Sequence, residues 1–69
     1  MNDAEMNDLI NESRKMGAII RTRLDDNGCI VAISIGKLPG GQYRKLGQPG
    51  TGWMPIIQGA EMLRREVAQ

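Results

Sequence analysis

The sequence predicts an α+β domain: an N-terminal helix, a three-stranded antiparallel sheet, and a C-terminal amphipathic helix packed on one face of that sheet. Two runs of alternating apolar residues, 18–24 and 29–35, flank the turn sequence Asp-Asp-Asn-Gly at 25–28 and predict a β-hairpin. The segments at both ends of the chain have helical periodicity instead. With 69 residues, the chain is expected to form one small domain, divided into an acidic helix (1–17), a β-sheet (18–46), a glycine-rich loop (47–54) and a helix (55–68).

The first element is an acidic helix predicted over residues 2–16. Asn2 is the expected N-cap, and Glu5 stands three residues later in the capping-box position. Arg14 and Lys15 fall in the last turn, where positive charge favours the helix dipole, and Gly17 suits the C-terminal cap. The apolar stripe is narrow and is interrupted by a serine; it consists of Met6, Leu9, Ile10 and Met16. We expect the methionines to pack, with a thioether surface for a partner as the alternative.

The hairpin has two distinct faces. With a two-residue turn at Asn27-Gly28, the predicted pairs are Leu24–Val31, Thr22–Ile33 and Ile20–Ile35. A four-residue loop would change the partners and keep the faces, because side chains alternate with period two. The face expected in the core is Ala18, Ile20, Thr22, Leu24, Cys29, Val31, Ile33 and Ile35. The opposite face presents Ile19, Arg21, Arg23, Ile30, Ala32 and Ser34, and therefore carries two neighbouring arginines.

A short third strand is predicted at residues 43–46, after the turn at 39–41. If Leu46 points into the core, Tyr43 and Lys45 join the arginine-bearing face. The loop at 47–54 has the glycine spacing of a phosphate-binding loop. However, Trp53 and Met54 stand where such a loop requires Lys and Ser or Thr, which argues against nucleotide hydrolysis.

The last helix is predicted from Pro55 to Ala68, with proline at the first helical position. Its buried stripe is expected to be Ile56, Ala60, Leu63 and Val67, widened by Ile57 and Met62. Glycine costs about 1 kcal/mol relative to alanine inside a helix, so Gly59 is expected to mark a close approach to the sheet. Trp53 is interpreted as a lid on the core, with ligand stacking as the alternative.

Composition argues against several classes of protein. The chain has no histidine and one cysteine, so neither histidine catalysis nor an intrachain disulfide is available, and a zinc site would lack ligands. Asp25 and Asp26, the only adjacent carboxylates, fall in the predicted turn, where Asp is favoured by local hydrogen bonds. No run approaches the roughly 18 apolar residues of a membrane span. We therefore expect a cytoplasmic, non-enzymatic binding protein without metal or cofactor.

Charge separation along the chain points to the binding surface. The net charge is +1, but residues 1–12 contain four acids and no base, whereas residues 14–54 contain seven bases and two acids. The first hypothesis is nucleic-acid binding by the basic outer face of the sheet, through Arg21, Arg23, Lys37, Tyr43 and Lys45. The alternative is a small regulator or inhibitor, such as those that mobile elements encode, that binds a larger protein complex through Met6, Ile19 and Ile30. Homodimerisation is compatible with either function.

Residues 19–67 resemble the three-stranded-sheet DNA-binding domains of plant ethylene-response factors and the arm-binding modules of tyrosine recombinases. The resemblance lies in the strand IIRTRL, the turn DDNG, the strand CIVAISI, the segment YRKLG and the closing amphipathic helix. It implies that arginines of the first strand contact DNA, which corresponds here to Arg21 and Arg23. The chain departs from those families in having no tryptophan in the hairpin and an acidic helix before the sheet.

Overall fold

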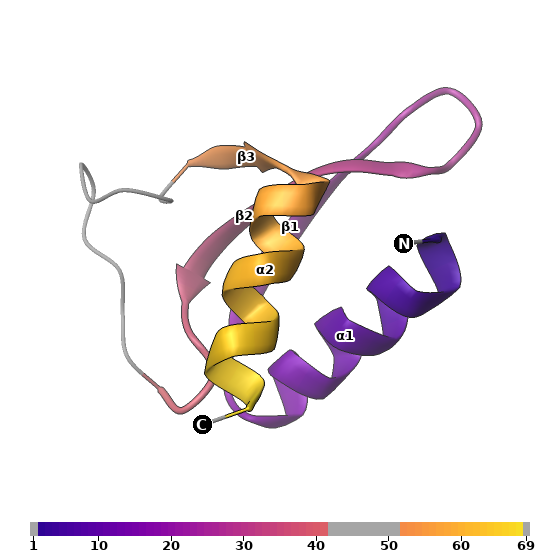
Figure 1. Cartoon of the computed structure of the whole chain (residues 1–69). Coiled ribbons are helices and arrows are strands. Elements are labelled where there is room, and N and C mark those ends of the chain that lie inside the picture. The colour runs from indigo at the N-terminus through magenta and orange to yellow at the C-terminus, as the bar shows by residue number, and fades with distance from the viewer. Residues whose placement is uncertain (1, 42–51, 69) are drawn as a thin grey trace.

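The protein has two helices on one face of a three-stranded antiparallel sheet, as the computed structural model in Figure 1 shows. The structure describes residues 2–41 and 52–68. The elements in chain order are α1 (Asp3–Lys15), β1 (Ile19–Leu24), β2 (Ile30–Lys37), β3 (Trp53–Pro55) and α2 (Ile56–Val67). The strand order is β1-β2-β3, so β2 is central and the other two strands are edges. The predicted α+β class is therefore confirmed.

Helix α1 begins and ends where the sequence predicts it to. The side chain of Asn2 accepts a hydrogen bond of 2.8 Å from the backbone N–H of Glu5, which satisfies one of the free donors of the first turn. Gly17 follows the helix with a φ of +91°, a left-handed conformation that favours glycine. Ser13, which interrupts the apolar stripe, is fully buried, and its hydroxyl donates to the Leu9 carbonyl at 2.8 Å.

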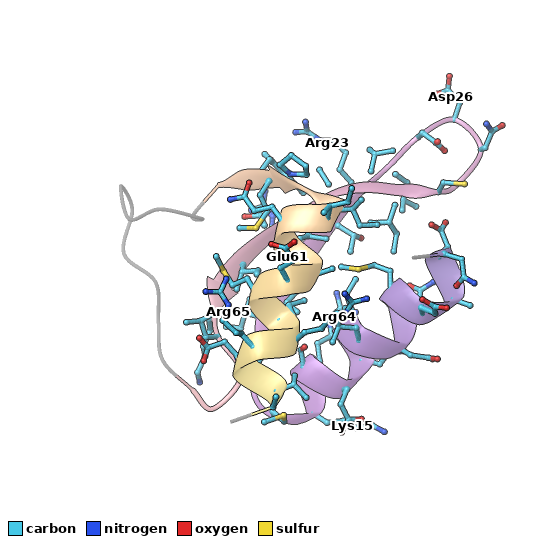
Figure 2. The ribbon with its side chains drawn as sticks, viewed as in Figure 1. Lys15, Arg23, Asp26, Glu61, Arg64 and Arg65 are labelled. Atoms are coloured by element: carbon cyan, nitrogen blue, oxygen red, sulfur yellow. The ribbon has the colours of Figure 1, made fainter. Side chains whose placement is uncertain are left out.

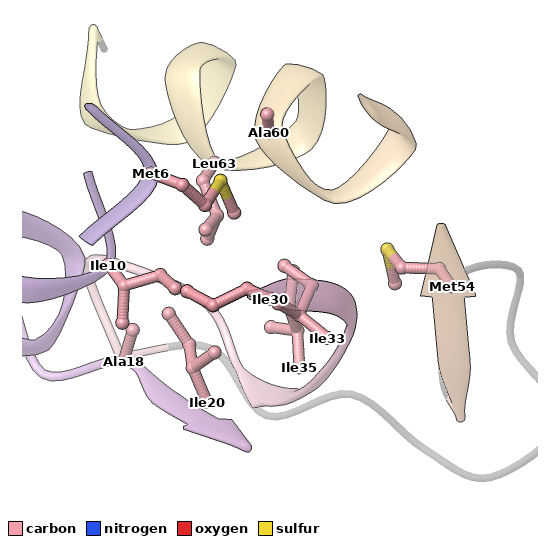
Figure 3. Packing of buried hydrophobic residues seen from close by; sticks show 10 residues of the cluster. All are labelled: Met6, Ile10, Ala18, Ile20, Ile30, Ile33, Ile35, Met54, Ala60 and Leu63. Carbon is pink, nitrogen blue, oxygen red and sulfur yellow. The ribbon is translucent and has the colours of Figure 1, made fainter. Parts of the chain in front are cut away.

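The core lies between the two helices and the sheet (Figure 3). It consists of Met6, Ile10, Ala18, Ile20, Ile30, Ile33, Ile35, Met54, Ala60 and Leu63. Helix α2 lies close to β2 at Gly59, where an added Cβ would lie 2.5 Å from Cγ1 of Ile33 and closer still to its Cδ1. The predicted close approach at Gly59 is confirmed. By contrast, Ile57 does not widen the buried stripe, because it is 73% exposed.

The hairpin loop contains three residues, whereas two or four were predicted. The N–H of Asp25 donates to the Cys29 carbonyl at 2.9 Å, and the N–H of Gly28 donates to the Asp25 carbonyl at 3.0 Å. Gly28 has a φ of +82°, so this is the three-residue pattern that ends on a left-handed glycine. The Asp25 carboxylate also accepts the N–H groups of Asn27 and Cys29, both at 2.9 Å. The predicted turn location is right and its length is wrong.

An odd loop shifts the pairing by one residue, and a β-bulge in β2 reverses that shift. Leu24 pairs with Ile30 rather than with Val31, because Val31 is the extra residue of the bulge between Arg23 and Leu24. Beyond the bulge, the predicted pairs Thr22–Ile33 and Ile20–Ile35 are confirmed. The bulge brings Ile30 into the core, so the prediction that Ile30 lies on the outer face is wrong.

Four residues predicted to face the core are exposed instead: Thr22, Leu24, Cys29 and Val31. Leu24, Cys29 and Val31 lie in or next to the hairpin tip, which projects beyond both helices in Figure 1, whereas Thr22 lies on the edge strand β1. Cys29 lies in the loop and is not the first residue of a strand. The core therefore uses only the part of the hairpin near α1 and α2.

The third strand also lies later in the chain than predicted. The predicted strand at 43–46 falls outside the described residues, whereas Trp53 and Met54, expected in a loop, belong to β3. Met54 is buried opposite Ile33, and this burial holds the strand on the sheet. Pro55 ends the strand on an edge, where a missing N–H breaks no ladder, and serves as N-cap of α2.

Candidate functional site

The side of the sheet that faces away from α1 and α2, which we call the outer face, carries the candidate site. Side chains alternate along each strand, so this face contains Ile19, Arg21, Arg23, Ala32, Ser34, Trp53 and Pro55. Lys37, at the end of β2, pairs with Ile19 across a second register shift. Neither helix packs on it in Figure 1, and Figure 2 shows Arg23 on the side of the sheet opposite α2. The strands β1, β2 and β3 contain three cationic residues and no acidic ones.

Strand pairing aligns the outer-face residues in two rows across the sheet. One row is Arg21–Ser34–Trp53 and the other is Arg23–Ala32–Pro55. In each row the arginine lies on one edge strand and a small residue lies on the central strand. Neighbouring strands are about 4.8 Å apart, so β1 and β3 are separated by roughly 10 Å. Trp53 is long enough to cross part of that distance over the small residues of β2.

The indole of Trp53 contacts both arginines from the far edge of the sheet. The guanidinium carbon Cζ of Arg23 lies 4.4 Å from the centre of the Trp53 ring, and that of Arg21 lies 5.4 Å from it. Both distances are within the range of attractive cation–π contacts. Ala32 and Ser34 are half-buried even though no helix covers them, as expected if the indole lies above them. We call Arg21, Arg23 and Trp53 the Arg-Trp cluster.

The cluster keeps two like charges close together on an exposed surface. Both arginines are exposed, and Trp53 is 39% exposed. At exposed sites a cation–π contact contributes about 0.5–1 kcal/mol, which offsets part of the repulsion between the two guanidinium groups. The arginine stems also cover apolar ring surface while the charges stay in water. The result is a small basic and aromatic surface available to an anionic ligand.

The sequence predicted the arginines of this surface and missed its aromatic residue. Arg21 and Arg23 are on the outer face as expected, and Lys37 pairs with Ile19 at the end of β2. Tyr43 and Lys45 lie outside the described residues. Trp53 is not a lid on the core. Strand alternation places it only once β3 is known, because the buried Met54 in that strand turns its neighbour Trp53 outward.

The residues expected for a protein partner are mostly inaccessible. Met6 is fully buried in the core, and Ile30 is buried as well, because the bulge turns it inward. Of these three residues only Ile19 is exposed, and it lies on the outer face. A separate surface hollow runs along α2 and is lined by Ile56, Ile57, Ala60, Glu61 and Arg64.

The hairpin tip carries the two adjacent carboxylates and the only cysteine. Asp25 accepts two backbone N–H groups and therefore organises the loop. The nearby carboxylates of Asp25 and then Asp3 raise the pKa of the Cys29 thiol, which disfavours the nucleophilic thiolate. Across residues 2–41 and 52–68, no three His, Cys, Asp or Glu side chains gather in a way that would hold a metal ion. In the same residue ranges, neither of the helices α1 and α2 is long and apolar enough to cross a membrane.

Comparisons of the chain with protein-family models, with curated proteins and with solved structures find no match. The resemblance to three-stranded-sheet DNA-binding domains therefore stays a prediction. The candidate site depends on the geometry of the outer face alone.

Proposed function

We propose that this protein is a small, non-enzymatic regulatory protein of the cytoplasm that binds nucleic acid through the outer face of its sheet. The observation that carries the proposal is the Arg-Trp cluster, in which two guanidinium groups lie over one indole on a face that neither helix covers. Arginine binds phosphates and guanine edges through a fork of donors, and aromatic rings bind bases. The strands that form this face contain no carboxylate to repel a polyanion.

The number of cations limits the expected affinity. Arg21, Arg23 and Lys37 supply three positive charges from the described strands, so binding should neutralise about two or three phosphates. Each phosphate neutralised on duplex DNA contributes about −0.9 to the slope of log affinity against log salt concentration. We therefore expect a slope between roughly −2 and −3, with weak binding at physiological salt.

The test compares two variants that lose the same charge on different faces. One is Arg21→Ala with Arg23→Ala, and the matched control is Lys15→Ala with Arg65→Ala, because both control residues are exposed on the helices. Fluorescence anisotropy with labelled oligonucleotides at 50 mM salt measures affinity, and circular dichroism checks that each variant is folded. We expect at least a tenfold loss for the strand variant and a clearly smaller loss for the control.

Two results would overturn the proposal. One is that the wild-type protein binds neither DNA nor RNA at 50 mM salt. The other is that both double variants weaken binding equally, because net charge and not the outer face would then account for the affinity.

A protein partner is the alternative function, and the exposed side chain of Ile19 beside the arginines is the observation that favours it. Arginine and apolar residues together are typical of protein contact surfaces. A pull-down from the native host, with and without nuclease, separates the two functions. A stoichiometric protein that survives nuclease and is lost in Ile19→Asp, but not in the double arginine variant, would replace nucleic acid as the ligand.

A further inference from the structure

We propose that the nucleic acid is single-stranded and that one of its bases stacks on Trp53, with Arg21 and Arg23 beside it. This inference rests on the proposed function and specifies its ligand. It follows from three features of the outer face: the exposure of Trp53, the position of the arginines against its ring, and the acidic tip of the hairpin.

The exposure of Trp53 is the first feature. The larger apolar side chains that lie between the sheet and the helices are buried, whereas Trp53 points to the opposite side and keeps 39% of its surface exposed. Its strand partner Ser34 is small, and so is Ala32 in the next row, so nothing on β2 rises above the indole. Every base has an apolar face that can stack on such a ring, and stacking of this kind is a general means of binding single strands.

The position of the arginines is the second feature. The Cζ atom of Arg23 lies 4.4 Å from the centre of the ring and that of Arg21 lies 5.4 Å from it, so both side chains lean toward β3 along the sheet. An arginine that contacts base edges in a duplex must reach into a major groove about 8.5 Å deep. To do so, these arginines would have to move away from the ring altogether. A base that stacks on the ring face under Arg23 displaces the guanidinium only sideways, to a position from which it can neutralise a phosphate next to that base.

The acidic hairpin tip is the third feature. Asp25 and Asp26 follow Arg23 closely in the chain, and Figure 2 shows Asp26 at the tip of the projecting loop. The two walls of a major groove are about 12 Å apart, so a duplex on the outer face would extend well beyond the Arg-Trp cluster and bring phosphates toward these carboxylates. One or two nucleotides over Trp53 would stay on the basic part of the sheet. The charge pattern therefore favours a single strand.

Trp53 also supplies the probe, because it is the only tryptophan in the chain. The experiment titrates the protein with a twelve-nucleotide oligothymidine and with a twelve-base-pair duplex at the same salt concentration. It follows both Trp53 fluorescence and the anisotropy of a label on the nucleic acid. We expect the single strand to quench Trp53 and to bind at least tenfold more tightly than the duplex.

Variants of Trp53 test the stacking contact itself. Stacking of one base on an aromatic side chain corresponds to about a 5- to 150-fold change in affinity. Trp53→Leu should lose affinity for the single strand by a factor in that range, whereas Trp53→Phe, which keeps an aromatic ring, should lose much less. Ile57→Ala, on the exposed side of α2, should leave affinity unchanged and is the control. Circular dichroism shows whether each variant is folded.

The outcomes separate this inference from the proposed function. Equal or tighter binding of the duplex overturns the single-strand inference, and so does unchanged affinity in folded Trp53→Leu. In either case the proposed function stands if the double arginine variant still weakens binding. If the wild-type protein binds neither probe, both proposals are wrong.

Discussion

Replacing Gly59 by alanine should destabilise the protein, although alanine is the better helix former. Intrinsic propensity favours the substitution by about 1 kcal/mol. The added Cβ would lie 2.5 Å from Cγ1 of Ile33, and real Cβ atoms essentially never come within 3.0 Å of such an atom. Ile33 is fully buried, so its side chain can give way only by moving its neighbours or the helix.

The structure allows an estimate of which effect wins. Inserting a methyl group into a packed core costs about 1–3 kcal/mol, and this contact is at the severe end because the clash reaches two atoms of one buried side chain. After the propensity gain, we expect Gly59→Ala to lower the free energy of unfolding by about 1–2 kcal/mol. For a domain of this size, that corresponds to a fall in Tm of roughly 5–15 °C.

Thermal and urea unfolding, each monitored by circular dichroism, measure this effect. Gln58→Ala, at the exposed neighbouring position of α2, is the matched control and should change stability by less than about 0.5 kcal/mol. Ile33→Val removes Cδ1, the closest clashing atom, so the penalty of Gly59→Ala should be smaller in that background. A gain in stability from Gly59→Ala in the wild-type background would refute the reasoning, because propensity would then outweigh the close approach.

Two further predictions concern the loop and the first helix. Asp25→Asn should speed alkylation of Cys29 at pH 8. The Asp25 carboxylate is the main cause of the raised thiol pKa, so removing its charge lowers that pKa and increases the thiolate fraction. The amide oxygen of the variant can still accept the loop hydrogen bonds. An unchanged rate in mass-spectrometric alkylation assays would contradict this cause. Asn2→Ala should cost about 1 kcal/mol in urea unfolding through loss of the N-cap. Asn7→Ala, exposed in the same helix, should cost clearly less, and equal losses would show that the cap contributes nothing specific.

The sequence predicted the elements of the fold well because local chemistry determines them. The cap at Asn2, the turn around Gly28 and the close approach at Gly59 each depend on one residue type with a definite conformational role. The α+β class followed from periodicity, and the outward position of the arginines followed from their alternation with Ile20, which is buried.

Predictions from the sequence were wrong where the number of residues in a loop or bulge, or a tertiary contact, determines which face a side chain takes. The loop has three residues and the bulge at Val31 adds one more, and neither number is fixed by residue type. Ile30 was therefore placed on the wrong face. β3 is too short to show periodicity and is held by the burial of Met54, so Trp53 could not be placed before the sheet was known.

The contact between α1 and the edge of the sheet bears on strand addition to β1. Arg14 donates a hydrogen bond of 2.8 Å from Nη2 to the carbonyl of Ile20, on the open side of β1. An exposed edge strand is a template on which further chains can add, and a charged side chain across its backbone obstructs that addition. The side chain of Arg14 therefore obstructs the addition of a further strand at the start of β1. Strand addition on β1 would have to begin nearer the hairpin tip, where Asp25 and Asp26 of successive copies would repel one another.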